Sequence, residues 1–203
     1  MSATGRSDVR HPLDAYQTPA WADQRYNIIY ADPPWSYRDK ASAGERGVTY
    51  HYPTMDLDTL KGLPTRSIAA YDCALFLWVT FPTLPDVFPL LDAWGFRYKT
   101  VAFTWVKVSK NNKLKIGMGN WTRANAEICL LATRGHPKRV SASVQSVILA
   151  EPREHSQKPD EVRERIVQLM GDLPRIELFA RTHTPGWDVW GLETGKFDEG
   201  EYL

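Results

Sequence analysis

One apolar strand that runs into a carboxylate and two prolines constrains the fold of this chain more than any other feature. Residues 28–35 read Ile-Ile-Tyr-Ala-Asp-Pro-Pro-Trp. The apolar run predicts a strand buried in a sheet, which delivers Asp32 to its carboxyl end. Ligand sites of open α/β sheets lie at this edge. The two prolines fix φ and remove two backbone N–H donors, so we expect the turn to present carbonyl oxygens.

The other apolar runs alternate with helix-like segments. We predict strands at 74–79, 100–106, 127–133, 146–150 and 176–179, and helices near 56–61, between Thr83 and Gly95, and at 159–170. This alternation favours an α/β fold with a mostly parallel sheet and helices on both faces. A chain of 203 residues suits one domain, which we place at 25–203 after a flexible N-terminal arm at 1–24.

Composition argues against several other classes of protein. The two cysteines, Cys73 and Cys129, lie inside apolar runs, which favours core packing over a disulfide or a metal site. No Cys/His cluster has zinc spacing, and no glycine-rich dinucleotide fingerprint or P-loop follows a strand, so we expect no metal, nicotinamide or NTPase site. No apolar stretch approaches a membrane span and no secretory signal is visible, so we expect no membrane contact and a cytoplasmic location.

Positive charge is concentrated in one part of a nearly balanced chain. The whole chain carries a net charge of +1, but between residues 107 and 139 eight Lys and Arg face a single acid, Glu127. The eight cations are Lys107, Lys110, Lys113, Lys115, Arg123, Arg134, Lys138 and Arg139. Such a segment is either a solvated loop face or a surface that contacts phosphates.

The turn at Asp32 has the chemistry to hold an amino group on a flat aromatic ring. The exocyclic amino group of adenine is a poor nucleophile, because its lone pair is delocalised into the ring. The Asp32 carboxylate and the Pro33 carbonyl could each accept one amino hydrogen and stabilise charge as it develops. Trp35 could stack on the base. The plainer interpretation is a strand that ends in a proline-rich turn.

Two further segments carry cofactor-like chemistry. Residues 155–160 (His-Ser-Gln-Lys-Pro-Asp) open a predicted helix, where Lys158 and the helix N-terminus would favour the carboxylate of an amino-acid-like cofactor. The same residues also suit an ordinary helix start. At the end of the last predicted strand, Phe179 could pack on an adenine ring and Arg181 could reach a ribose or a carboxylate.

Taken together, these motifs resemble the MT-A70 family of S-adenosylmethionine-dependent adenine-N6 methyltransferases, in order from about Tyr26 to Glu193. The resemblance implies a Rossmann-like methyltransferase fold in which the catalytic motif precedes the cofactor-binding strand. The segments that carry it are Asp32–Trp35, Tyr50–Met55, Phe76–Thr80, Trp105–Lys107, His155–Pro159 and Ile176–Phe179.

The resemblance also implies roles for individual residues. Asp32 and Pro33 hold the target amino group and border the methyl donor, while Pro34 and Trp35 shape the base pocket. The cofactor would be contacted by Asp32, Pro33, Lys158, Phe179, Arg181, His183 and Glu193. The family usually has an Asn that bonds the cofactor ribose after the Trp-Gly pair at 190–191; this chain has Leu192 there, followed by Glu193.

A second set of residues is predicted to face the nucleic acid. Tyr52 and Trp78 would be aromatic walls near the base or else core residues, and Trp105 is predicted to be core. Residues 117–127 resemble the family's loop after the third strand, which faces the nucleic acid or a partner subunit. The substrate-binding prediction therefore comprises Tyr52, Trp78, Lys110, Lys113, Lys115, Asn120, Trp121, Arg123 and Glu127.

These observations predict an enzyme that methylates the exocyclic nitrogen of adenine in nucleic acid. DNA is preferred, because the chain lacks the helical and zinc-finger regions of the family's messenger-RNA enzymes. An RNA adenine-N6 methyltransferase and a non-catalytic nucleic-acid-binding subunit of a methyltransferase complex remain as alternatives. A monomer or a homodimer is expected.

Overall fold

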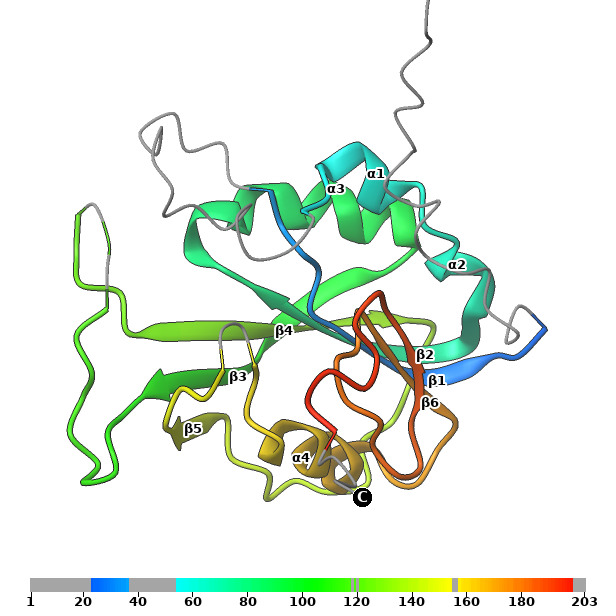
Figure 1. Cartoon of the computed structure of the whole chain (residues 1–203). Coiled ribbons are helices and arrows are strands. Elements are labelled where there is room, and N and C mark those ends of the chain that lie inside the picture. The colour runs from blue at the N-terminus through cyan, green and yellow to red at the C-terminus, as the bar shows by residue number, and fades with distance from the viewer. Residues whose placement is uncertain (1–22, 37–53, 118, 120, 155–156, 199–203) are drawn as a thin grey trace, which may run out of the picture.

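The computed structural model describes residues 23–36, 54–117, 119, 121–154 and 157–198. Its seven strands form one sheet in the order β5-β3-β4-β2-β1-β6-β7 (Figure 1). The strands are β1 (Tyr26–Ala31), β2 (Ala69–Val79), β3 (Arg97–Lys107), β4 (Ala126–Arg134), β5 (Val147–Ala150), β6 (Arg175–Leu178) and β7 (Asp188–Trp190).

The sheet is mostly parallel, as predicted, with one strand reversed. β1 pairs in parallel with both β2 and β6, β6 pairs in parallel with β7, and β3 with β5. β4 is antiparallel to both of its neighbours, β2 and β3. The reason is local: a long loop without a crossover helix joins β3 to β4, so the chain returns antiparallel to β3. β1, which carries the Asp-Pro-Pro-Trp motif, precedes β6 in sequence and lies beside it in the sheet, as the resemblance implied.

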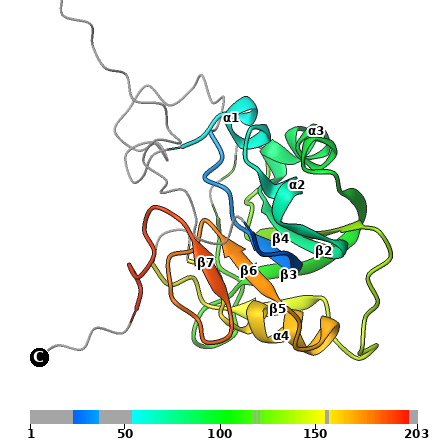
Figure 2. The same cartoon turned by 90° about the vertical axis from the view of Figure 1, so that its right-hand side faces the viewer.

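Helices cover both faces of the sheet (Figure 2). α1 (Leu57–Lys61), α2 (Thr65–Ile68) and α3 (Leu84–Trp94) lie on one face, and α4 (Glu161–Met170) lies on the other. Strand β1 serves both cores because its side chains alternate: Ile29 packs with the first set of helices and Ile28 with α4. A short 3₁₀ turn, η3 (Phe81–Thr83), joins β2 to α3.

The helix boundaries follow from local chemistry. Asp56 caps α1 by accepting a bond from the Thr59 N–H at 2.8 Å. Thr83 does precede α3, but its hydroxyl donates to the Thr80 carbonyl instead of capping the helix. α3 ends at Gly95, whose φ of +80° permits the left-handed turn that closes the helix. Pro89 lies inside α3.

The long connection between β3 and β4 contains a small hairpin that the sequence did not reveal. Val108 and Leu114 form an antiparallel bridge, and Lys115 N–H donates to the Lys107 carbonyl at 2.9 Å. Asn112 occupies the turn with a φ of +54°, a conformation that Asn tolerates better than most residues. The first residues of the loop therefore fold back on themselves before the chain enters β4.

The predicted flexible arm at 1–24 lies outside the described residues except for residues 23 and 24. Among the described residues no helix is both long and apolar enough to cross a membrane.

Candidate active site

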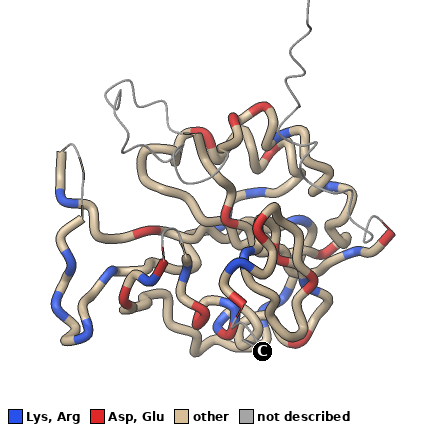
Figure 3. Tube along the Cα trace, viewed as in Figure 1, with Lys and Arg blue, Asp and Glu red and all other residues tan. Residues whose placement is uncertain are grey.

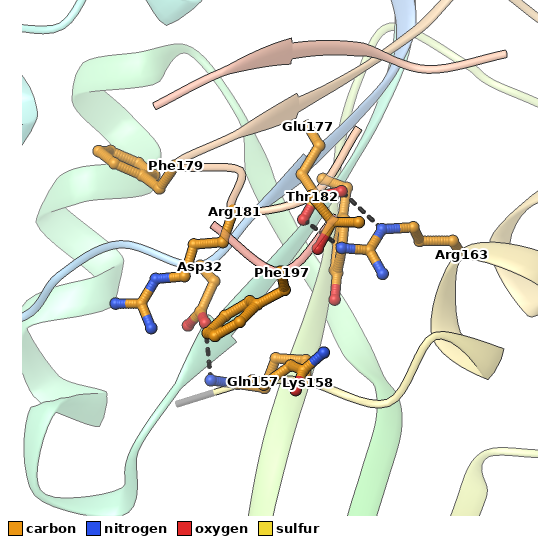
Figure 4. Close-up of a pocket in the computed structure, with 10 residues that line it drawn as sticks. Asp32, Gln157, Lys158, Arg163, Glu177, Phe179, Arg181, Thr182 and Phe197 are labelled. Carbon is orange, nitrogen blue, oxygen red and sulfur yellow. Dashed lines mark hydrogen bonds and ion pairs between the residues drawn. The ribbon is translucent and has the colours of Figure 1, made fainter. Parts of the chain in front are cut away.

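Three segments that are far apart in the sequence meet at the carboxyl ends of β1 and β6 (Figure 4). They are the turn after β1, the approach to α4, and the segment after β6. The pocket between them is lined by Tyr30, Asp32, Gln157, Lys158, Arg163, Glu177, Phe179, Arg181, Thr182 and Phe197. The structure thus brings together Asp32, Lys158, Phe179 and Arg181, four of the residues predicted to hold a cofactor.

The proline turn is more closed than predicted. Pro33 and Pro34 are buried, and the Pro33 carbonyl accepts the Trp35 N–H at 2.8 Å. The Pro34 carbonyl accepts the Met55 N–H, also at 2.8 Å. Both proline carbonyls therefore already accept one hydrogen bond within the protein. The Pro33 oxygen still has a second lone pair for an incoming donor.

Trp35, predicted to face the base, and Trp78, predicted either to face the base or to be a core residue, are both buried. Trp35 is 6% exposed, and its indole N–H donates to the Trp78 carbonyl at 3.1 Å. Trp78 is 1% exposed, and its own N–H donates to the Tyr30 hydroxyl at 2.7 Å. The Lys158 ammonium lies 5.4 Å from the centre of the Trp78 ring. In this structure, therefore, neither ring presents a surface on which a base can stack; Trp78 supports Lys158.

A row of alternating charges runs through the site. The Lys158 ammonium is 2.7 Å from Oδ2 of Asp32 and 3.3 Å from Oε2 of Glu127. The Lys107 ammonium is 2.5 Å from the other Glu127 oxygen, Oε1. Glu127, predicted to bind substrate, therefore joins two lysines, and Lys158 joins two carboxylates.

Burial and pairing shift the pKa values in this row unequally. Burial alone would lower the pKa of Lys158, but Asp32 and Glu127 raise it well above its usual value. Burial tends to raise the pKa of Glu127, yet Lys158 and Lys107 together lower it. Burial raises the pKa of Asp32, because Lys158 offsets the burial only in part and Glu127 adds repulsion. Asp32 is therefore the less compensated carboxylate, which suits a site that receives a further cation.

The segment after β6 forms the opposite wall of the pocket. Phe179 has a φ of +63°, and its ring meets Trp190 edge-on at 5.6 Å. Arg181 lines the pocket, and its Nε lies 3.2 Å from Oε2 of Glu193. Glu193 does not line this pocket, and its other carboxylate oxygen, Oε1, lies 2.5 Å from the Lys196 ammonium. A side chain at Gly191 would come within 2.5 Å of the Ala180 carbonyl, so this close approach requires glycine.

His183 lies in a second, larger pocket that adjoins the first. The two pockets share Gln157, Arg163, Thr182 and Phe197, and the second has a volume of about 410 Å³. There the Asp198 carboxylate accepts two bonds from His183, one from its backbone N–H and one at Nδ1, both at 2.7 Å. His183 lowers the pKa of Asp198 through these bonds. A carboxylate is therefore already bound at this turn.

Sequence reasoning missed a buried ion pair at the pocket. Arg163 donates from Nε to one oxygen of Glu177 at 2.6 Å and from its terminal nitrogen to the other at 2.8 Å. Arg163 also bonds Asp160 at 2.9 Å. A charged residue in a helix usually points to solvent. The only signal in the sequence was that Arg163 directly follows Val162, which lies on the buried face of the helix. Gln157, Thr182 and Phe197 carried no signal of their own.

The predicted nucleic-acid residues lie beside the pocket rather than in it. Lys110, Lys113, Lys115 and Arg123 are exposed, and Trp121 is fully exposed. Figure 3 shows Lys and Arg positions spaced along the loop between β3 and β4. Tyr52 and Asn120 lie outside the described residues.

The basic segment from 107 to 139 is not one surface. Arg134 pairs with Cys73 in the early part of β2, whereas Ile128 pairs with Val79 at its end. Nine residues of β4 separate the two ends of the segment, about 30 Å at roughly 3.3 Å per residue. Arg134, Lys138 and Arg139 therefore lie toward the edge opposite the pocket, away from the exposed lysines of the β3–β4 loop.

The charged groups of the pocket are paired with one another. The carboxylates Asp32 and Glu177 are paired with Lys158 and Arg163, and Phe179 and the Arg181 guanidinium complete the wall. Among the described residues no three His, Cys, Asp or Glu side chains come together as a metal site would require.

Comparison with known proteins agrees with the geometry. The model of the MT-A70 family matches residues 26–193. Type II methyltransferase M.MunI of Mycoplasma sp is 35% identical over 201 residues, covering 90% of this chain and 83% of that protein. The METTL3 catalytic subunit of the Homo sapiens N(6)-adenosine-methyltransferase is 30% identical over 172 residues, covering 82% of this chain but only 28% of that protein. An MT-A70-like N(6)-adenosine-methyltransferase of Arabidopsis thaliana is 31% identical, with 80% of this chain and 23% of that protein covered. The chain belongs to the MT-A70 family.

Proposed function

We propose that this chain transfers the methyl group of S-adenosylmethionine to the exocyclic N6 of adenine in DNA. The observation that carries the proposal is the state of Asp32. Its side chain is 28% exposed at the carboxyl end of β1, and its ammonium partner Lys158 is shared with Glu127. An incompletely compensated carboxylate at the mouth of a pocket is suited to accept a hydrogen bond from an amino group that becomes positive.

Asp32 and Pro33 act on the target nitrogen in complementary ways. Lys158 engages Oδ2 of Asp32, so we assign Oδ1 as the acceptor for one N6 hydrogen. The remaining lone pair of the Pro33 carbonyl accepts the other hydrogen. These two bonds turn the nitrogen lone pair out of conjugation with the ring and stabilise the positive charge on N6 until one proton leaves. S-adenosylmethionine would supply the activated methyl group on its sulfonium.

The cofactor would be held by residues of both pockets. Phe179 provides an aromatic face for the adenine, and Arg181 lies within reach of the ribose. The carboxylate of the methionine part is better placed at His183 than at Lys158, because Lys158 already serves two carboxylates. His183 binds the Asp198 carboxylate through two donors, which supports a carboxylate site at this turn.

Two observations favour DNA over RNA as the substrate: the share of each relative's length that the chain covers, and the exposed lysines of the β3–β4 loop. The chain spans most of a Type II methyltransferase but only about a quarter of the N(6)-adenosine-methyltransferases. The exposed lysines of the β3–β4 loop suit a phosphate backbone, and a target adenine must leave its stack to reach Asp32. We also propose that residues 25–203 form one methyltransferase domain. The protein would act as a monomer or homodimer in the cytoplasm.

A transfer assay with labelled S-adenosylmethionine on single-stranded DNA, duplex DNA and RNA of one sequence tests the proposal. We expect incorporation into DNA, with unpaired adenines reacting best. Preferred labelling of RNA would favour the RNA alternative. Cofactor binding without transfer to any substrate would favour the non-catalytic subunit, for which Leu192 in place of the family's usual Asn is the motivating feature.

A further inference from the structure

Lys107 stands at the far end of the charged row that reaches Asp32. The row runs from Lys107 to Glu127, then to Lys158, and then to Asp32, with separations of 2.5, 3.3 and 2.7 Å. Lys107 is the last residue of β3, directly before the exposed loop. Its side chain is 29% exposed, so it is held in the domain rather than on the loop.

Two tryptophans form a floor beneath the two lysines. The Lys107 ammonium lies 5.0 Å from the centre of the Trp105 ring, as Lys158 lies 5.4 Å from that of Trp78. The two rings meet edge-on at 6.5 Å. Trp105 is anchored by a bond from its indole N–H to the Ala150 carbonyl at 3.0 Å. Cation–π contacts with fixed rings restrict both ammonium groups to defined places.

The consequence of this arrangement is a balance of charge around Lys158. Lys107 pairs with one carboxylate oxygen of Glu127 and compensates part of its negative charge, so the attraction of Glu127 for the Lys158 ammonium is weaker. Lys158 accordingly lies closer to Asp32 than to Glu127, at 2.7 against 3.3 Å. Without Lys107, Glu127 would carry an uncompensated charge in a partly buried place and would draw Lys158 toward itself.

We propose that Lys107 is a positioning residue for methyl transfer, which acts through Glu127 to keep Lys158 on Asp32. This proposal rests on the proposed role of Asp32 in that reaction. The other titratable or charged groups around Asp32 are Glu177 on β6, Arg181 beyond the end of β6 and Cys129 on β4. Within the described part of the chain, the ion pair of Lys107 is with Glu127. Lys107 therefore reaches Asp32 through Glu127 and Lys158.

The test compares Lys107→Met, which retains the stem over Trp105 but removes the charge, with Lys107→Arg, which retains the charge. Lys99→Met removes an exposed cation from the same strand, β3, and serves as the matched control, because Lys99 has no role in the site. For Lys107→Met we expect kcat to fall by roughly tenfold, less than for a group that contacts the reacting atoms. The KM values for DNA and cofactor should change by less than about twofold. Lys107→Arg should restore most of kcat.

The pH profile distinguishes positioning from a general structural role. Asp32 must be ionised to accept from N6, and a weaker hold of Lys158 on it raises its pKa further. The acid limb of kcat should therefore move to higher pH in Lys107→Met. Glu127→Gln leaves Lys158 wholly to Asp32, so its acid limb should move to lower pH, whatever its effect on kcat.

Three results would overturn the proposal. One is a raised KM for DNA at unchanged kcat in Lys107→Met, which would make Lys107 a phosphate contact. Another is acid limbs that do not move in opposite directions in Lys107→Met and Glu127→Gln. The third is an equal loss of kcat in Lys99→Met. If the wild-type protein itself transfers no methyl group, or if Asp32→Asn transfers it normally, it is the proposed function that fails.

If Lys107→Met does not fold, Lys107→Arg and Glu127→Gln still test the proposal. An acid limb that does not move in Glu127→Gln would contradict a coupling of Glu127 to Asp32 through Lys158.

Discussion

The pocket and the β3–β4 loop both depend on lysine, but they use its charge in opposite ways. In the pocket, Lys158 is 9% exposed in its side chain and lies between two carboxylates. On the loop, Lys110, Lys113 and Lys115 point into solvent. Buried charge pairs set protonation and position, whereas exposed charges act at longer range and are screened by salt. Changes in the pocket should therefore alter kcat or stability, and changes on the loop should alter substrate binding.

The largest effect is expected at the least compensated carboxylate. Asp32→Asn removes the charge that accepts from N6 but keeps the shape of the side chain. We expect kcat to fall by roughly a hundredfold or more, with cofactor affinity changed far less. Wild-type activity should itself be lost as the pH falls through the raised pKa of Asp32, because protonation removes the acceptor. Steady-state kinetics over a range of pH measure both; turnover near the wild-type rate would rule out this role.

Removal of one partner from the buried ion pair should cost stability. Arg163→Met leaves the Glu177 carboxylate buried without the guanidinium that bonds both of its oxygens. We expect the free energy of unfolding to fall by about 3 kcal/mol. Lys61→Met, which breaks the exposed pair with Asp58 on α1, is the control and should cost less than about 1 kcal/mol. Urea denaturation of both variants gives the comparison; similar losses would show that the pair at Arg163 is energetically ordinary.

On the loop, the joint change of Lys110, Lys113 and Lys115 to Ala should weaken DNA binding without altering the pocket. The dependence of log affinity on log salt should become shallower by up to about 2.7, since each neutralised phosphate contributes about 0.9 for duplex DNA. Cofactor affinity measured by calorimetry should not change. Normal binding and methylation at moderate salt would mean that the loop is only solvated and that another surface holds the substrate.

The smallest expected effect concerns the carboxylate that already lies at His183. If the carboxylate of S-adenosylmethionine binds the same two donors of His183, it must first displace the Asp198 carboxylate. The free energy of this displacement lowers the apparent affinity for S-adenosylmethionine. Asp198→Ala should therefore bind S-adenosylmethionine roughly two- to fivefold more tightly. The affinity for 5′-methylthioadenosine, which lacks the carboxylate, should stay the same. Weaker binding of the full cofactor would indicate that Asp198 organises the turn instead of competing for it.

The same contrast explains which features could be predicted from the sequence. Strand β1 and the place of Asp32 at its end followed from one apolar run, and the convergence of Lys158 and Phe179 on Asp32 followed from the rule that ligands bind at the carboxyl edge. The burial of Trp78 did not, because an aromatic residue at a strand end suits a core as well as a binding face.

Features that depend on partners far away in the sequence were the hardest to predict. The bond between Arg163 and Glu177 joins a helix to a strand, and nothing in either segment specifies the other. The division of the basic segment between two edges follows from the length and reversal of β4, which a count of charges along the chain cannot show.

The most direct test of the central claim is the identity of the methylated base. DNA incubated with the protein and S-adenosylmethionine can be digested to nucleosides and analysed by mass spectrometry, with Asp32→Asn in parallel. We predict N6-methyladenine in the wild-type sample and at most a trace with Asp32→Asn. The account would be contradicted by N4-methylcytosine as the product, by no methylated base in DNA, or by equal N6-methyladenine in both samples.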